Sequence, residues 1–246
     1  MYLIPKSHPR AKSLYIREKL VKGFDGGVVA KEGLMAHGRG EAFDYLLGEK
    51  TTKYAQNAIR AAASSLVSAK YPVISVNGNV AALCPREIVK LAKIVNAKIE
   101  INLFYTNQKR KETIVKVLKK SGAKEVLGTD SKSSRRILGL DSARRVVDSN
   151  GIYKADVIVV PLEDGDRTIA LKKMGKKVIT FDLNPLSRTA KTADITIVDN
   201  LVRAINRLII ECRSKKIRKA PFNNKKNLSA CVLEIKKNLS RRLPNA

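Results

Sequence analysis

Clusters of polar and charged residues follow five apolar runs between Tyr71 and Asn200. The clusters are residues 77–79, residue 102 with 105–107, residues 163–168, residues 182–189 and residues 199–200. Turn formation favours the same residue types, so any single cluster is explained without a ligand. Five clusters in succession, each at the end of an apolar run, indicate an edge that binds a small molecule.

The cluster at 182–189 has the best chemistry for binding phosphate. Arg188 is a planar cation flanked by the hydroxyls of Ser187 and Thr189, close to the start of an expected helix with free backbone N–H groups. Asp182 can accept hydrogen bonds from ribose hydroxyls or hold a metal ion. This segment predicts one wall of a site for a phosphorylated ligand.

Two further clusters have chemistry of their own. Gly78 allows the backbone to approach a ligand closely, and Asn77 and Asn79 can both donate and accept hydrogen bonds. The carboxylates at 163–166 suit two roles: they can hold Mg²⁺ together with phosphate oxygens, or they can cap the helix that follows. Both roles remain open, and they are compatible with each other.

In the N-terminal part, Arg39 lies between two glycines, where the backbone is open and the guanidinium can bind phosphate. Gly38-Arg39-Gly40 is not a dinucleotide fingerprint, because Phe43 stands where the third glycine is required. Gly48-Glu49-Lys50-Thr51 likewise lacks the upstream glycine of a P-loop. Arg17, from its residue type alone, is expected to be a solvated charge.

Strand and helix patterns alternate from Tyr71 onward. The short apolar runs are 72–76, 97–103, 157–161, 177–181 and 195–198, and the helical segments are 85–95, 109–121, 167–174 and 201–210. Runs this continuously apolar are typical of parallel strands buried on both faces. Ligands bind at the carboxyl ends of such strands, so this fold gathers the five clusters at one edge. The predicted fold class is α/β, with a Rossmann-like parallel sheet and flanking helices.

The segments around this core, residues 71–210, are expected to be mostly helical. Residues 1–70 form a helical N-terminal part that packs on the core: a helix capped by Ser7, a glycine-containing loop around residues 33–40, a short helix at 41–47 and an Ala-rich helix at 51–69. Residues 126–127 favour a short strand, and 129–151 favour a polar loop that is either mobile or part of the site. We expect one structural domain overall.

Residues 211–246 form a basic C-terminal tail. Within it, Leu228, Val232, Ile235 and Leu239 recur at the spacing of one helical stripe. Such an amphipathic helix is expected to dock on the body of the protein or on a partner subunit.

Composition narrows the classes of function. The net charge of +27 favours anionic ligands, although a biased composition explains it equally well. Three scattered cysteines and two histidines argue against a disulfide framework, a zinc site and Cys/His or Ser/His/Asp catalysis. The chemistry is therefore expected to rely on positioning and charge stabilisation. The first residues lack a signal-peptide core and no apolar run reaches membrane length, so we expect a cytoplasmic protein.

Several strings of residues resemble the archaeal 4-phosphopantoate–β-alanine ligase family, also called phosphopantothenate synthetase. The strings are Ile4-Pro5-Lys6-Ser7-His8-Pro9-Arg10-Ala11 and residues 37–49, 73–82, 160–168 and 182–189. The resemblance covers roughly residues 2–210. The tail after Glu211 looks unlike the family's usual ending, and the segment 129–140 is more basic than the family leads us to expect.

The resemblance implies a homodimer with a Rossmann-like core that acts in coenzyme A biosynthesis. It implies condensation of 4-phosphopantoate with β-alanine through an acyl-adenylate, while ATP is split to AMP and diphosphate. The family's ATP contacts match Arg17, Arg39, Asp182, Leu183, Asn184, Arg188, Thr189, Asn200 and Leu201. The resemblance therefore predicts that Arg17 contacts ATP, rather than being only a solvated charge.

Two polyanions must meet in such a reaction, which requires several cations at one site. We expect Mg²⁺ together with Arg17, Arg39 and Arg188 to supply them, with Arg39 and Arg188 as catalytic residues that stabilise charge on the α-phosphate. The contacts to 4-phosphopantoate are predicted at Asn77, Asn79 and Arg167, and the metal ligands are left unassigned.

Two other functions would each explain part of the sequence. A nucleic-acid-binding α/β protein would explain the basic surface, but only 5% of residues are aromatic and Trp is absent, so nucleic-acid binding is expected at most through the tail. A Rossmann oxidoreductase would need the dinucleotide fingerprint that this sequence lacks.

Overall fold

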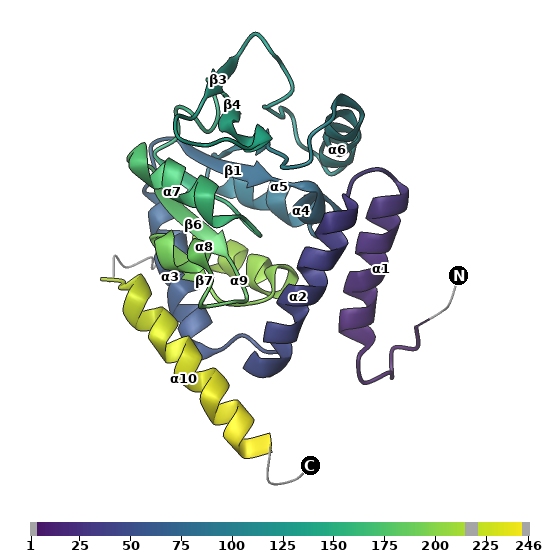
Figure 1. Cartoon of the computed structure of the whole chain (residues 1–246), viewed down its shortest axis with the longest axis vertical. Helices are drawn as coiled ribbons and strands as arrows, with labels where there is room; N and C mark the ends of the chain where they lie inside the picture. The colour runs from purple at the N-terminus through teal and green to yellow at the C-terminus, as the bar shows by residue number, and fades with distance from the viewer. Residues whose placement is uncertain (1–3, 215–220, 243–246) are drawn as a thin grey trace.

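A computed structural model of the chain describes residues 4–214 and 221–242 (Figure 1). The strands are β1 (Pro72–Val76), β2 (Lys98–Ile101), β3 (Ser134–Arg136), β4 (Val146–Asp148), β5 (Val157–Val159), β6 (Lys177–Phe181) and β7 (Ile195–Ile197). The helices are α1 (Ala11–Asp25), α2 (Lys31–Leu47), α3 (Lys53–Val67), α4 (Gly78–Leu83), α5 (Pro85–Ile94), α6 (Gln108–Lys120), α7 (Gly165–Lys173), α8 (Arg188–Thr192), α9 (Leu201–Arg213) and α10 (Asn224–Arg242), with a short 3₁₀ helix η1 (Ala143–Arg145).

The predicted fold class is confirmed. Five parallel strands form one sheet in the order β2-β1-β5-β6-β7, and each lies within one of the five apolar runs. The chain runs from β1 outward to β2 on one side, and from β5 through β6 to β7 on the other. The order therefore reverses between β1 and β5, which is where parallel sheets of this kind open a crevice for ligands.

Both faces of the sheet are covered, which explains why the strands are apolar without alternation. Residues such as Ile74 and Ile179 face the larger core, which contains buried residues of α3, α5 and α9. The alternate residues, such as Val73 and Val178, face a second core made with α7 and the segment 137–155. The two cores hold the sheet rigid beneath its carboxyl edge.

Helix α2 lies across that carboxyl edge. The carbonyl of Gly33 accepts a hydrogen bond from Asn79 of α4, the helix after β1 (2.8 Å). Gly40 faces Leu183 after β6, and Asp44 pairs with Arg203 of α9 after β7 (2.6 Å). From Gly33 to Asp44 the helix rises ~16 Å, and three strand spacings from β1 to β7 cover ~14 Å. The helix thus matches the width of the sheet that it crosses.

The loop expected around residues 33–40 is wrong, because Gly33, Gly38 and Gly40 all lie inside α2. Packing against the sheet edge outweighs the low helix propensity of three glycines. A Cβ atom at Gly33 would collide with the side chain of Asn79, so this glycine allows the close approach of α2 to the loop after β1.

The segment 129–151 was expected to be a polar loop, and this is correct only in part, because two short strands and a 3₁₀ helix interrupt its irregular stretches. Strands β3 and β4 pair as an antiparallel hairpin, and Ile137, Leu140 and Val147 are buried against the sheet. Glu100 of β2 holds the segment in place by accepting backbone hydrogen bonds from Asp148 (3.0 Å) and from residue 152 (2.6 Å). Burial raises the pKa of Glu100 to about 7, and these hydrogen bonds oppose the rise.

The short strand expected at 126–127 is reduced to a single parallel bridge between Leu127 and Glu100. This bridge lies beside β2. It ties the start of the 129–151 segment to the sheet.

Helix α10 confirms the amphipathic helix predicted for the tail and docks it on the body of the protein. Leu228 is buried and Ile235 packs in a cluster with residues of α2 and α8, whereas Leu239, at the far end of the predicted stripe, is exposed. The side chain of Asn227 donates to the carbonyl of Tyr54 (3.2 Å), and that of Asn238 donates to the carbonyl of Leu46 (3.0 Å). Residues 215–220 and 243–246 of the predicted tail lie outside the described residues.

In the described part of the chain, no helix has the length and apolar character needed to span a membrane.

The start of α4 approaches the α1–α2 connection so closely that Gly78 has no room for a side chain. A Cβ atom there would collide with the carbonyl oxygen of Val28 and lie 3.3 Å from the Cα atom of Val29. We expect Gly78→Ala to lower the free energy of unfolding by about 1–3 kcal/mol, because the two backbone segments must separate. Urea denaturation measures this change.

Gly38→Ala is the matched control. A Cβ atom at Gly38 meets no heavy atom within 4 Å, and the residue lies in the interior of α2. This variant should be more stable than the parent by ~0.5–1 kcal/mol, because alanine favours helix. Equal effects of the two substitutions would contradict the close approach at Gly78.

Candidate active site

The side chain of Arg39, on α2, lies close enough to the carboxylate after β6 to influence its charge. Burial raises the pKa of Asp182, and the Asp182–Ser187 hydrogen bond, the backbone N–H of Asn184 and the positive charge of Arg39 oppose this rise. Leu183 is buried, and its side chain lies 3.8 Å from a Cβ atom built at Gly40. The segment 182–184 and the middle of α2 therefore form one continuous surface.

The segment from Asp182 to Thr189 is held by its own hydrogen bonds. Asp182 accepts from the hydroxyl of Ser187 and from the N–H of Asn184 (2.9 Å). Ser187 accepts from the N–H of Ala190 (2.9 Å) and so caps α8. Thr189 donates to the carbonyl of residue 163 (2.9 Å), which joins this segment to the loop after β5.

Three arginines predicted to bind ATP approach this surface from different elements. Arg17 of α1 pairs with the buried Glu41 of α2 (2.9 Å), and this contact raises the pKa of Arg17 and fixes its direction. Arg188 pairs with Asp166 (2.6 Å), and both side chains are largely exposed, at 69% and 64%. Arg39 is exposed and forms no ion pair with any residue in the described part of the chain.

The loop after β7 joins α2 through a charged cluster. Arg203 pairs with Asp199 (2.5 Å) and with Asp44 (2.6 Å), and the side chain of Asn200 lies 3.4 Å from Asp44. Burial raises the pKa of Asp199, while Arg203 and the hydroxyl of residue 51 hold it down. Asn200 caps α9 by accepting from Val202 (3.0 Å), and this places Asn200 at the edge beneath α2.

Beside β1, the amides of Asn77 and Asn79 are engaged with neighbouring backbone. Asn77 caps α4 and donates to the carbonyls of Pro161 (3.1 Å) and Leu162 (3.2 Å). Asn79 donates to Gly33 of α2 (2.8 Å). Leu162 has a positive φ of 54°, a strained conformation for a branched residue, and Asn77 holds its carbonyl in place.

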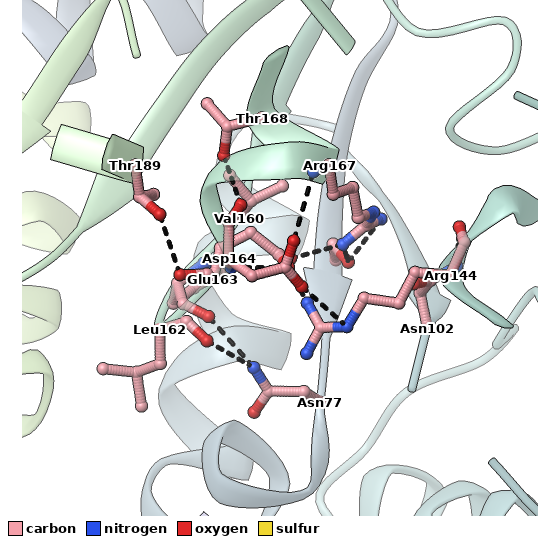
Figure 2. A network of polar contacts seen from close by, with 12 residues as sticks. Asn77, Asn102, Arg144, Val160, Leu162, Glu163, Asp164, Arg167, Thr168 and Thr189 are labelled. Carbon is pink, nitrogen blue, oxygen red and sulfur yellow. Dashed lines mark hydrogen bonds and ion pairs between the residues drawn. The ribbon is translucent and has the colours of Figure 1, made fainter. Parts of the chain in front are cut away.

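Two buried arginines meet one glutamate at the reversal point of the sheet, as Figure 2 shows. Glu163, whose side chain is 2% exposed, pairs with both Arg144 and Arg167. Arg167 is fully buried and also contacts the hydroxyl of Ser75 (3.2 Å), whereas Arg144 lies 3.6 Å from Asp164. Burial lowers the pKa of each arginine to about 10, so both stay charged at neutral pH.

The carboxylates at 163–166 had two predicted roles, and the structure bears out helix capping. Asp164 accepts from the N–H of Arg167 (3.1 Å) at the start of α7. The other two carboxylates, Glu163 and Asp166, pair with arginines. In residues 4–214 and 221–242, no group of three or more His, Cys, Asp or Glu side chains is placed to hold a metal ion. These residues therefore do not make a Mg²⁺ site from protein ligands alone.

The predicted ATP residues are brought together along α2 and the carboxyl ends of β6 and β7. Arg17 joins them through Glu41. Of the predicted substrate contacts, Asn77 and Asn79 lie at the end of β1, whereas Arg167 has no exposed surface. Sequence reasoning missed Asp44, Arg203 and Arg144, because their partners lie far away in the chain and no local motif marks them.

Comparison with known proteins places the chain in a family. A family model described as phosphopantothenate/pantothenate synthetase matches residues 54–238. The chain belongs to the phosphopantothenate/pantothenate synthetase family. As predicted, it is an enzyme of the ligase class.

Members of the phosphopantothenate/pantothenate synthetase family from several archaea match nearly the full chain. A relative from Thermococcus kodakarensis, named 4-phosphopantoate–β-alanine ligase, is 54% identical over 98% of this chain and 95% of its own length. A relative of the same name from Methanosarcina mazei is 51% identical over 96% and 95%. The match to the family model runs to residue 238, so the likeness extends through most of α10 instead of ending near residue 210.

The buried ion pairs of Glu163 at the reversal point are expected to stabilise the folded protein. Glu163→Gln leaves Arg144 and Arg167 buried without their shared counter-charge. We expect a loss of about 3–5 kcal/mol in the free energy of unfolding at pH 7, measured by urea denaturation.

The control lies three residues away, in the first turn of α7. Asp166→Asn removes the partner of Arg188, but that pair is exposed to solvent, so the change should stay within about 1 kcal/mol. A Glu163→Gln variant as stable as Asp166→Asn would show that the buried pairs do not hold the loop.

Proposed function

We propose that this enzyme condenses 4-phosphopantoate with β-alanine at the expense of ATP, releasing AMP and diphosphate, as a step of coenzyme A biosynthesis. The observation that carries the proposal is the identity of 51–54% over nearly the full chain to relatives with the corresponding name. The clustering of Arg39, Asp182 and Thr189 on one surface supports it, because these positions match the family's ATP contacts.

The chemistry explains why ATP is needed. A carboxylate does not react with an amine in neutral water, so it must first acquire a leaving group. In the proposed first step, a carboxylate oxygen of 4-phosphopantoate bonds to the α-phosphorus of ATP and diphosphate leaves. In the second step, the uncharged amine of β-alanine bonds to the acyl carbon, AMP leaves from it, and the amine loses a proton to solvent.

The arginines at the carboxyl edge of the sheet suit a reaction between two polyanions. Arg39 is exposed and forms no ion pair in the described part of the chain, so its guanidinium N–H groups are available to a phosphate. Arg188 is held by a solvent-exposed pair with Asp166, which a stronger anion can replace. Arg17 is oriented by Glu41. We propose Arg39 and Arg188 as the catalytic cations at the α-phosphate.

The remaining nucleotide contacts are proposed from the same family match. Asp182, Leu183 and Asn184 would line the nucleoside, Thr189 the phosphates, and Asn200 and Leu201 the far wall beneath α2. Mg²⁺ is proposed to enter with the phosphates of ATP, as it often does where a protein offers few carboxylates. No step above depends on a metal held by the protein. We further propose that the enzyme works as a homodimer.

One assay tests the proposed function. AMP formation from ATP should require both 4-phosphopantoate and β-alanine, and the product should be 4′-phosphopantothenate. AMP formation without β-alanine at the full steady rate, or ADP as the nucleotide product, would contradict the proposal.

Arg39 gives the sharpest mutational test of the proposed mechanism. Arg39→Ala removes an exposed charge, so the melting temperature should stay unchanged while turnover falls by ~10²–10³-fold. Lys31→Ala, an exposed cation at the start of the same helix, is the control and should keep the activity of the parent. Near-normal turnover in Arg39→Ala would reject the role.

A further inference from the structure

A pocket of about 230 Å³ opens at the carboxyl end of β2, away from the residues matched to ATP. Its polar lining consists of Asn102, Thr106, Lys111, Arg136 and Arg145. The side chains come from separate elements: the end of β2 and the loop after it, helix α6, strand β3 and η1. Because four parts of the chain contribute side chains, the pocket depends on the tertiary fold and not on one helix alone.

Every ionisable side chain that lines this pocket is positively charged. Lys111, Arg136 and Arg145 line it, and its lining contains no carboxylate. Lys111 is held in place by donating to the carbonyl of Gly128 (2.9 Å) and retains further N–H donors. Three cationic residues that line one pocket, with no carboxylate in the lining, favour a ligand with more than one negative charge, such as a phosphate monoester.

Asn102 adds a second, independent sign of a ligand. It is 3% exposed, and its amide nitrogen donates to the carbonyls of Arg144 (3.2 Å) and Val146 (2.9 Å). Asn102 lines the pocket, and its amide oxygen is buried without a hydrogen-bond partner among the described residues. An unpaired buried acceptor calls for a donor, and a ligand hydroxyl supplies one.

The walls between these polar groups are apolar. Ile101, Leu103 and Val146 line the pocket, and such walls suit a short branched carbon chain between a phosphate and a hydroxyl. These features together describe a phosphorylated hydroxy acid.

The position of the pocket fits a substrate that must reach the nucleotide. In the sheet order, β2 lies two strand spacings from β5, or ~10 Å along the carboxyl edge. Helix α7, which follows β5, contains Asp166, the partner of Arg188, in its first turn. A ligand held by its phosphate at β2 can therefore extend its other end along the edge toward the catalytic cations proposed above.

We propose that this pocket binds the phosphate end of the acid substrate, with Lys111, Arg136 and Arg145 on the phosphate and the Asn102 oxygen on the hydroxyl. The inference rests on the proposed function and makes it more specific. It also reassigns the predicted substrate contacts: Asn77, Asn79 and Arg167 position the loops beside the pocket, because their side chains are engaged within the protein.

The test removes one pocket charge at a time. We expect Lys111→Met and Arg145→Gln each to raise the KM for 4-phosphopantoate by about tenfold or more, as the loss of one charge-assisted hydrogen bond does. The KM values for ATP and β-alanine should stay unchanged. With pantoate, which lacks the phosphate, kcat/KM should be the same in variant and parent, so that the preference for the phosphorylated acid shrinks.

The chain offers a matched control for each variant. Lys116→Met removes an exposed charge from the same helix, α6, and Arg135→Gln removes the exposed arginine next to Arg136 on β3; neither residue lines the pocket. Both controls should leave the KM for 4-phosphopantoate unchanged. An equal rise in KM in controls and pocket variants would mean that only the general positive charge of the surface matters, and would overturn the proposal.

Direct binding separates a failure of this proposal from a failure of the proposed function. In isothermal titration, 4-phosphopantoate should bind the parent and both controls, and bind the two pocket variants about tenfold more weakly. Inorganic phosphate should compete with 4-phosphopantoate in the parent, and the weaker binding of pantoate should be the same in the parent and the pocket variants. Unaltered affinity in the pocket variants overturns the assignment even if the ligase reaction is confirmed, whereas weakened affinity supports it even if no AMP forms.

Discussion

The placement of α2 across the carboxyl edge is the constraint on which the rest of the site depends. A parallel sheet presents loop ends at this edge but does not itself close over a ligand. Here the helix is fixed at one end by Asn79 and at the other by Arg203, which pairs with Asp44 and Asp199. Because the helix spans the strands in between, its exposed face carries Arg39 to the loop that follows β6.

Charge in this protein is organised locally rather than spread as a uniform basic coat. At the reversal point, Glu163 holds two buried arginines together, and near β7 Arg203 holds two carboxylates together. The first arrangement, with Asp164 beside Arg144, balances charge beneath the carboxyl edge of the sheet, and the second fixes α2. The net charge of +27 therefore does not show that individual cations have different roles in the structure.

Much of the fold could be predicted from the sequence, because its strongest signals are local. Each of the five parallel strands lies within a predicted apolar run, and Asn200 and Ser187 start helices in the way that capping residues commonly do. The path of α2 could not be predicted, because three glycines argue against a helix and the contacts that stabilise it come from β1, β6 and β7. The pocket at β2 was hidden for a similar reason. Its residues are distant in sequence, and 129–151 has too few apolar residues to indicate a buried segment.

The docking of α10 has a consequence for how the protein is made. The side chain of Asn238 bonds the carbonyl of Leu46, so the end of α2 is completed by a residue synthesised 192 positions later. Contacts so remote in sequence form late in folding, because a long loop must close first. A growing chain on the ribosome would thus hold a folded sheet while the carboxyl end of α2 still lacks its last partner. The carboxyl edge that α2 crosses therefore reaches its final form only after residue 238 has been added to the chain.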